Sequence, residues 1–279
     1  MNDRDHARSS AISQQTDNGN GSRAAEPGAD GHPVLLASLS VRDAGLASAH
    51  EAEQNRLLHA LPLEEYALLR PRLTPVRLRH KDVLVESDTP IRDVYFVREG
   101  VGSVLATDHE RGELEVGTIG PEGFVGLPVL NGTDRMSYRV FVQIAGDGWR
   151  LSADAFRQLV DERPVVRRLL LRYSQYFTDQ VSQSAACNQL HTLEERCARW
   201  LLMTHDRVQG DTFELTHEFL SLMLGVRRAG VSVAMGTLQA AAVVRYTRGR
   251  IVILDRPRLE EASCGCYHIT QTALARLLG

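Results

Sequence analysis

The chain has 279 residues, of which 43% are hydrophobic and 24% are charged, and it carries a formal net charge of −3 at pH 7. This length leaves room for two domains, and the composition is ordinary for a soluble protein. No run approaches the roughly 18 apolar residues of a membrane span, and the N-terminus lacks the apolar segment of a secretion signal. We therefore expect a cytoplasmic protein with no membrane partner.

The first fifty or so residues differ in composition from the rest. They contain no Phe, Tyr or Trp and are rich in Ser, Gly, Asn, Gln, Asp and Ala. Such a segment cannot bury enough apolar surface to offset the entropy that ordering would cost. The sequence predicts a disordered tail over residues 1–52.

Short apolar runs follow, from Val76 to Leu151, separated by Gly, Asp, Asn and Pro. Many short strands at near-regular spacing are typical of an antiparallel β-barrel or jelly roll. The sequence predicts such a domain over residues 53–163, beginning with a short helical part at 56–62 and 66–69. Its strands are expected at 83–85, 94–97, 101–105, 114–119 and 140–144.

A long helix is predicted over residues 164–190, opened by Pro164 at a position where a helix tolerates proline. Residues along it recur at intervals of four and three, as they do in the seam of a coiled coil. A helix packed on its own barrel would show much the same pattern. If the seam joins two chains, it uses Val166, Leu170, Tyr173 and Phe177.

The segment from Leu215 to Val244 is typical of two helices joined by a glycine turn. Thr216 can cap the first helix, and Gly225 can end it in a left-handed conformation. From Arg228 onward, one face of the second helix is apolar. The opposite face carries Arg227, Arg228 and Ser232, and an ordinary helix pair with solvated arginines remains the alternative.

Two β-rich runs come next and are joined through Thr247, Arg248 and Gly249, which predicts a hairpin with the arginine and the glycine at its tip. From Thr216 to Arg258 there are seven arginines and two acidic residues, although the chain as a whole is acidic. A local positive excess of this kind is typical of a surface that binds phosphates.

Taken together, these features resemble the Crp/Fnr family of bacterial transcription regulators. The resemblance covers roughly residues 57–267, and three ordered landmarks support it in the barrel: 97–100 (VREG), 120–126 (GPEGFVG) and 156–160 (FRQLV). It implies an α+β fold with a cyclic-nucleotide-binding-like barrel, a dimerisation helix over 164–190, a winged helix-turn-helix domain over 191–267 and a helical extension over 268–279. It also implies a homodimer that binds specific double-stranded DNA and contacts RNA polymerase.

Roles in DNA binding follow from the same resemblance. Arg228 stands where the family carries an arginine that reads guanine in the major groove. Arg227 and Ser232 are further candidates for base contacts, and Ser232 could equally reach a phosphate. Contacts to the DNA backbone are expected from Thr216, Arg248 and Arg250.

The resemblance weakens at the effector pocket. The family's nucleotide pocket uses a Gly-Glu pair for the ribose and an Arg-Ser pair for the cyclic phosphate. Here Gly126 is followed by Leu127, so the carboxylate is missing, and Arg135 and Ser137 form the only nearby clamp, at a different spacing. We expect Arg135 to be a solvated loop residue, no resident cofactor, and an effector other than a cyclic nucleotide, or none.

Metal and enzyme chemistry find little support in the sequence. Cys264 and Cys266, together with His268, offer at most three ligands, too few for a closed zinc site, so no metal is predicted. The oxygen-sensing branch of the family binds an iron-sulfur cluster through cysteines near the N-terminus, whereas the first cysteine here is Cys187.

Two other functions would use a domain of this kind, a metal-dependent enzyme and a sensor without DNA binding. A cupin-type enzyme would need clustered histidines, but His80 and His109 are solitary in the predicted barrel, so we predict no enzyme. A sensor that acts through protein contacts alone would keep the barrel and lose DNA affinity.

Overall fold

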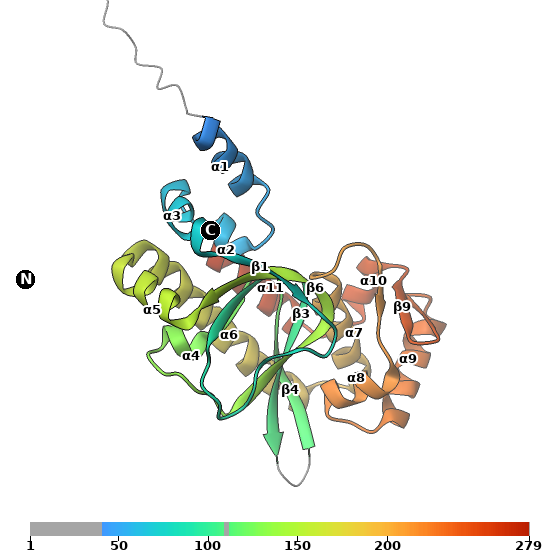
Figure 1. Ribbon diagram of the computed structural model, residues 1–279. Coiled ribbons are helices and arrows are strands. Elements are labelled where there is room, and N and C mark those ends of the chain that lie inside the picture. Colours follow the sequence, from blue (N-terminus) through green and yellow to red (C-terminus); the bar gives the residue numbers. More distant parts are fainter. Residues whose placement is uncertain (1–40, 109–111, 279) are drawn as a thin grey trace, which may run out of the picture. The chain divides into compact units, whose positions relative to one another are not determined.

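The computed structural model describes residues 41–108 and 112–278 (Figure 1). Its N-terminal part consists of α1 (Val41–Glu51), α2 (Arg56–His59), α3 (Leu63–Leu69) and the 3-10 turn η1 (Arg70–Arg72). The prediction of a disordered tail over 1–52 is wrong for α1, and residues 1–40 lie outside the described residues. Alanine and leucine favour a helix in this segment, and Leu46 packs against the main core.

A six-stranded antiparallel sheet forms the sensor-like domain. Four strands follow the order β1-β6-β3-β4, while β2 pairs with β6 and β5 pairs with β3. The sheet is open and jelly-roll-like and does not close into a barrel. The strands are β1 (Thr74–Leu78), β2 (Val83–Val85), β3 (Asp93–Asp108), β4 (Gly112–Ile119), β5 (Phe124–Val125) and β6 (Tyr138–Ser152).

The two strands predicted at 94–97 and 101–105 are one strand, β3. The chain bends without reversing at Gly100, where the register against β6 shifts. Gly100 has a φ of +96°, and a Cβ atom there would lie 2.5 Å from the carbonyl oxygen of Ile144. A glycine in a strand pattern therefore marks a β-bulge here instead of a turn.

Three helices pack on this sheet domain: α4 (Leu127–Leu130), α5 (Ala153–Glu162) and α6 (Pro164–Leu190). An aromatic group at the centre of the core joins β3, β5, α5 and α6. The ring of Phe124 lies 5.6 Å from Phe96, 5.5 Å from Phe156 and 5.2 Å from Tyr173, measured between centroids. Helix α6 has the predicted bounds and is anchored to the domain by its apolar face.

This anchoring overturns the predicted dimer seam. Val166, Leu170, Tyr173 and Phe177 are all buried within a single chain, in the same core as the sheet. They are therefore not available to a second protomer. The alternating spacing of four and three residues arises because a helix on a sheet buries the same narrow stripe as a helix in a coiled coil.

The C-terminal domain begins with α7 (Leu193–His205), which starts in a capping box formed by Thr192 and Glu195. Then follow β7 (Thr212–Glu214), α8 (His217–Leu224), α9 (Arg228–Ala240), β8 (Val244–Thr247), β9 (Arg250–Ile253), α10 (Arg256–Glu261) and α11 (Cys266–Leu278). The strands form a sheet in the order β7-β9-β8. Trp200 lies in the core of this domain with the buried faces of α8 and α9.

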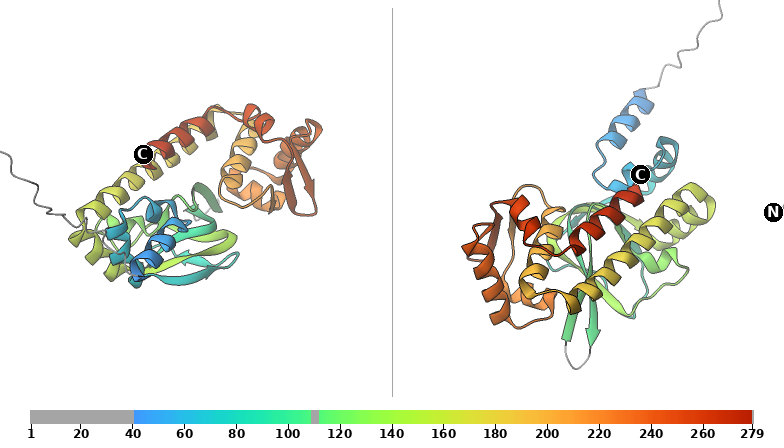
Figure 2. Two further views of the ribbon diagram at one scale, coloured as in Figure 1. Left: turned by 90° about the horizontal axis from the view of Figure 1, so that it is seen from above. Right: turned by 180° about the vertical axis from the view of Figure 1, so that it is seen from behind.

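Helix α11 returns from the C-terminal domain and lies along α6 (Figure 2). Leu274 and Leu277 join the core of the sheet domain, and Arg172 of α6 donates to the carbonyl of Arg276. The predicted helical extension over 268–279 corresponds to α11, which begins two residues earlier, at Cys266, while Gly279 lies outside the described residues. No single helix in the described part of the chain is long and apolar enough to cross a membrane.

Candidate nucleic-acid interface

Helices α8 and α9 form a helix-turn-helix. The hydroxyl of Thr216 caps α8 by accepting from the backbone N–H of Phe219 at 3.1 Å. Gly225 ends α8 in the left-handed region, with a φ of +63°. The two helices are bent by 107° at this turn, within the range of about 90–120° that is typical of the motif.

The second helix, α9, divides into a buried and an exposed face. Val231, Ala234, Met235 and Leu238 are buried in the domain core, as the spacing predicts. Arg228, Ser232, Val233 and Gly236 are exposed. At Arg227 the backbone is extended and no side chain caps the helix. The first backbone N–H groups of α9 are therefore free of a side-chain partner and can face an anion.

Arg228 and Ser232 lie one turn apart on the exposed face. The guanidinium of Arg228 pairs with Glu218 at 3.4 Å, but the two side chains are 65% and 81% exposed. A pair this exposed contributes little and can be exchanged for a contact with DNA. The hydroxyl of Ser232 donates to the carbonyl of Arg228 at 3.1 Å, so its position depends on the first turn of the helix.

His217 is a residue of this surface that the sequence analysis missed. Its Nδ1 lies 3.1 Å from the Ser232 hydroxyl, and its ring stacks on Tyr246 of β8 with centroids 4.1 Å apart. Burial, and then the charge of Arg228, lower the pKa of His217. A neutral imidazole thus joins α8, α9 and β8, a contact that no local spacing could reveal.

Strands β8 and β9 form the predicted wing. Arg248 and Gly249 occupy its tip with φ values of +49° and +81°, the pair of left-handed residues that a type I′ hairpin requires. The carbonyl of Gly249 accepts from the N–H of Leu215 at 2.8 Å, which fixes the wing beside the start of α8. Arg248 and Arg250 are exposed on either side of Gly249, where a Cβ atom would lie 3.5 Å from the side chain of Thr216.

One arginine of the basic segment 216–258, Arg256, forms hydrogen bonds within the C-terminal domain. Arg256 donates to Asp206 at 2.6 Å, to Glu260 at 2.9 Å and to the phenol oxygen of Tyr267. It therefore connects α10 with α7 and α11, and its charge is compensated. The positive excess on the surface comes instead from the other six arginines, all of which are exposed: Arg227, Arg228, Arg245, Arg248, Arg250 and Arg258.

The predicted effector residues do not form a clamp. Gly126 precedes α4 with a φ of +122°. Arg135 is 54% exposed, pairs with Asp134 at 3.7 Å and donates to the carbonyl of Asp88 at 2.7 Å. Ser137 is exposed as well. Arg135 thus lies in a solvated loop, as expected, and it is not positioned to bind a phosphate inside the domain.

Cyclic nucleotides are therefore expected to bind no better than at millimolar concentration. Neither a carboxylate for the ribose nor a buried arginine for the phosphate is present at these positions, and without such charge-assisted bonds the binding free energy stays above about −4 kcal/mol. Isothermal titration calorimetry with cyclic AMP and cyclic GMP checks this. A micromolar dissociation constant for either nucleotide would contradict the assignment of Arg135.

The sheet domain is joined to the C-terminal domain by buried polar contacts. Arg207, which follows α7, donates two bonds to Glu122 at 2.9 and 2.7 Å, and both side chains are buried. On β4, Glu115 accepts from the indole N–H of Trp200 at 2.7 Å and from the Ser103 hydroxyl at 2.6 Å. Movement of one domain against the other would therefore expose charged groups or leave them unpaired.

Stability is expected to depend on pH through Glu115. Burial raises the pKa of Glu115 from 4.5 to about 7, although its hydrogen bonds and nearby arginines oppose the shift. The folded chain then holds a proton that the unfolded chain releases above pH 4.5, so this carboxyl reduces the unfolding free energy as the pH rises from about 4.5 to 7.

Urea unfolding at pH 5 and at pH 8 checks this expectation. The variant Glu115→Gln, which cannot ionise, is expected to lose less stability between the two pH values than the parent chain. An equal loss in both proteins would show that Glu115 does not titrate in the folded state.

Of the two histidines considered for a cupin-type metal site, only His80 lies among the described residues. His80 is hydrogen-bonded through Nδ1 to the carbonyl of Gln143 at 2.8 Å, and His109 lies outside the described residues. A cupin-type site needs several such side chains around one metal. The residues predicted to contact DNA all lie on α8, on α9, next to these helices or on the wing, and together they form the candidate interface.

Comparison with known proteins agrees with this geometry. Residues 75–163 match the model of the cyclic nucleotide-binding domain, and residues 195–262 match that of the Crp-like helix-turn-helix domain. Together the two matches cover more than half of the chain. No curated protein matched the sequence.

Solved structures with the same fold include three regulators. FixK2 from Bradyrhizobium japonicum is 19% identical, with a TM-score of 0.59 over 69% of this chain and 98% of its own. A putative Crp/Fnr-family regulator from Eubacterium rectale is 18% identical, with a TM-score of 0.58 over 74% of this chain and 96% of its own. The cyclic-di-GMP-responsive regulator CLP from Xanthomonas campestris is 16% identical, with a TM-score of 0.55 over 69% of this chain and 99% of its own.

At these identities the solved structures show a shared fold. The two domain matches identify the sheet domain and the C-terminal domain. A cyclic-nucleotide-binding domain, followed by a long helix and a Crp-like helix-turn-helix, is the arrangement found here. The chain therefore belongs to the Crp/Fnr family of transcription regulators.

Proposed function

We propose that this regulator reads double-stranded DNA through the exposed face of α9. Arg228 binds a guanine edge, Arg227 and Ser232 extend the contact, and Thr216, Arg248 and Arg250 hold the phosphates on either side. The observation that carries this proposal is the position of an exposed basic helix next to a basic wing, fixed to each other by His217 and Gly249.

The dimensions and charges of the surface suit the major groove. Helix α9 has 13 residues, and its exposed face carries small side chains after the arginine pair. A groove about 12 Å wide admits one helix of this kind. The uncapped start of α9 and the arginines of the wing then meet the phosphates, which supply most of the salt-dependent affinity.

We also propose the exposed face of α6 as the dimer contact. Members of this family typically dimerise, and among the described residues neither the sheet domain nor α11 covers the strip of α6 that carries Leu171. Leu171 is 44% exposed on that face. Gln175, Thr178 and Ser182 follow it at intervals of four and three residues and are exposed too. Such a seam is weak in apolar contacts, so we expect a dimer that dissociates readily.

The location, the lack of catalysis and the action on RNA polymerase are proposed because they are typical of a transcription regulator of this type. We propose a cytoplasmic protein without catalytic activity that acts on RNA polymerase at promoters. The domain contacts at Glu122 and Glu115 support coupling between a signal at the sheet domain and the position of the C-terminal domain.

Selection of bound fragments from genomic DNA, followed by footprinting, tests the proposed function. We expect a two-fold symmetric site with half-site centres about 34 Å apart, since a symmetric dimer presents two copies of α9. Affinity is expected to fall steeply as salt increases. Absence of specific binding would favour a sensor that acts through protein contacts alone.

A further inference from the structure

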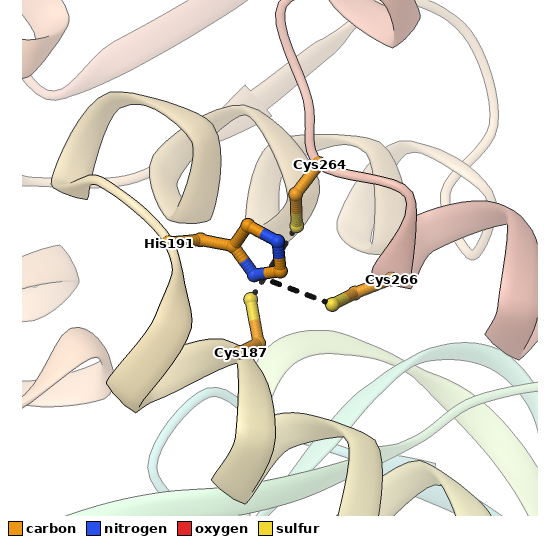
Figure 3. Close-up of side chains that lie close together, drawn as sticks. All are labelled: Cys187, His191, Cys264 and Cys266. Carbon is orange, nitrogen blue, oxygen red and sulfur yellow. Dashed lines mark hydrogen bonds between the residues drawn. The ribbon is translucent and has the colours of Figure 1, made fainter.

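Three cysteines and one histidine converge where α6 ends and α11 begins (Figure 3). Cys187 lies in the last turn of α6, and His191 follows α6 directly. Cys264 precedes α11, and Cys266 is its first residue. One ligand atom from each of the four side chains lies within 4.8 Å of the other three. All three cysteines are buried.

The sequence does not reveal this group, because the histidine nearest to Cys264 and Cys266 along the chain is His268. His268 is exposed and does not belong to the cluster. The structure supplies two other ligands, Cys187 and His191, which are four residues apart and lie more than seventy residues earlier in the chain. Together with Cys264 and Cys266 they give the four ligands that a closed tetrahedral site requires.

Two of the six distances between the ligand atoms match the edges of a tetrahedral metal site, and the other four are no longer than 4.8 Å. The sulfur atoms of Cys187 and Cys264 are 3.5 Å apart, and the sulfur of Cys266 is 3.5 Å from Nδ1 of His191. With zinc-sulfur bonds of about 2.3 Å and zinc-nitrogen bonds of about 2.0 Å, the edges of a tetrahedron are roughly 3.5–3.8 Å long. A disulfide would need sulfur atoms about 2.05 Å apart.

Two neighbouring side chains suit an anionic metal centre. The amide of Gln183 donates to the sulfur of Cys266 at 3.0 Å, as outer partners of metal-bound thiolates do. Arg199 is buried, donates to Ser184 at 3.2 Å and has no hydrogen-bond partner for its Nε among the described residues. Three thiolates and a neutral histidine around a divalent ion leave one negative charge, which would compensate this buried cation.

We propose that Cys187, His191, Cys264 and Cys266 bind one structural Zn²⁺ ion per protomer. All four positions of a tetrahedral ion are filled by protein, so the site is closed and has no place for a substrate. The two pairs of ligands flank residues 192–263, which contain the helix-turn-helix and the wing. The ion therefore clamps both chain ends of the DNA-binding domain to the end of α6.

Metal analysis of the tag-free full-length protein tests this proposal. Inductively coupled plasma mass spectrometry is expected to find about one zinc per protomer. The double variant Cys264→Ser/Cys266→Ser is expected to lose it. The control is Cys197→Ala, which removes a buried thiol of the separate core around Trp200 and is expected to keep full zinc content.

A second measurement does not depend on the folding of a variant. After chelation of the parent protein, titration with cobalt(II) is expected to give the intense visible absorption of a tetrahedral thiolate site, saturating at one equivalent per protomer. Zinc is then expected to displace the cobalt, and chelation is expected to lower the melting temperature.

Several outcomes would overturn the proposal. One is a protein without stoichiometric zinc that also gives no tetrahedral cobalt spectrum. Another is iron with acid-labile sulfide in place of zinc, and a third is a Cys187–Cys264 disulfide in protein isolated under reducing conditions. Unchanged zinc content in the double variant would equally exclude these four ligands.

Discussion

Replacing Leu170 by glutamate is expected to unfold the protein, whereas replacing its neighbour Leu171 by glutamate is expected to separate the dimer and leave each protomer folded. The two leucines lie on different faces of α6, because successive residues of a helix are rotated by about 100° around its axis. Leu170 is 2% exposed and belongs to the core beneath the sheet, while Leu171 is 44% exposed. A carboxylate at position 170 would have to be buried without a partner, at a cost of more than about 3 kcal/mol.

At position 171 the carboxylate remains in water in the single chain. In the proposed dimer two such charges face each other across the seam, so the dimer dissociation constant is expected to rise at least about tenfold. Thermal melting by circular dichroism reports the fold of both variants, and sedimentation velocity reports their mass. A Leu171→Glu protein that stays fully dimeric would exclude this face of α6, and a Leu170→Glu protein with parental melting would contradict the packing of α6.

The helix-turn-helix could be predicted from the sequence because its signals are local. Thr216, Gly225 and the apolar spacing from Val231 to Leu238 each act within one or two turns of helix. The wing is equally local, since the backbone at Arg248 and Gly249 determines the turn. These elements are found as expected, and the base-reading roles of Arg227, Arg228 and Ser232 remain predictions.

The predicted dimer seam of α6 is wrong because the same spacing of apolar residues has two structural explanations. The spacing of Val166, Leu170, Tyr173 and Phe177 fits a coiled coil and a helix on its own sheet equally well, and the aromatic core around Phe124 decides for the sheet. Helix α1 is not apparent in the sequence because its stability depends on contacts outside its own segment, including the contact of His50 with the tilted ring of Tyr66, 4.7 Å away between centroids.

Contacts between distant segments could not be predicted at all. The pairing of Glu122 with Arg207, the stacking of His217 on Tyr246 and the approach of Cys187 to Cys264 each join residues that neither helical nor strand periodicity relates. One sequence offers no signal for such pairs, because they arise from the packing of whole elements.

The central claim is that α9 reads bases in the major groove, and the base preference of Arg228→Ala tests it most directly. Arg228 is placed to bind a guanine edge, so its loss is expected to cost about 1–3 kcal/mol on the preferred site and to remove the preference at one base pair of each half-site. The matched control is Arg248→Gly at the wing tip, where glycine adopts the required left-handed backbone.

The control variant is expected to weaken binding to all sequences alike, to keep the base preference and to reduce the salt dependence by roughly one unit per phosphate contact. Competitive selection from a randomised DNA pool, at several salt concentrations, measures both effects for the two variants and the parent. We expect a selective loss of one base preference for Arg228→Ala only. A uniform loss of affinity in Arg228→Ala, with every base preference retained, would contradict the placement of α9 in the major groove.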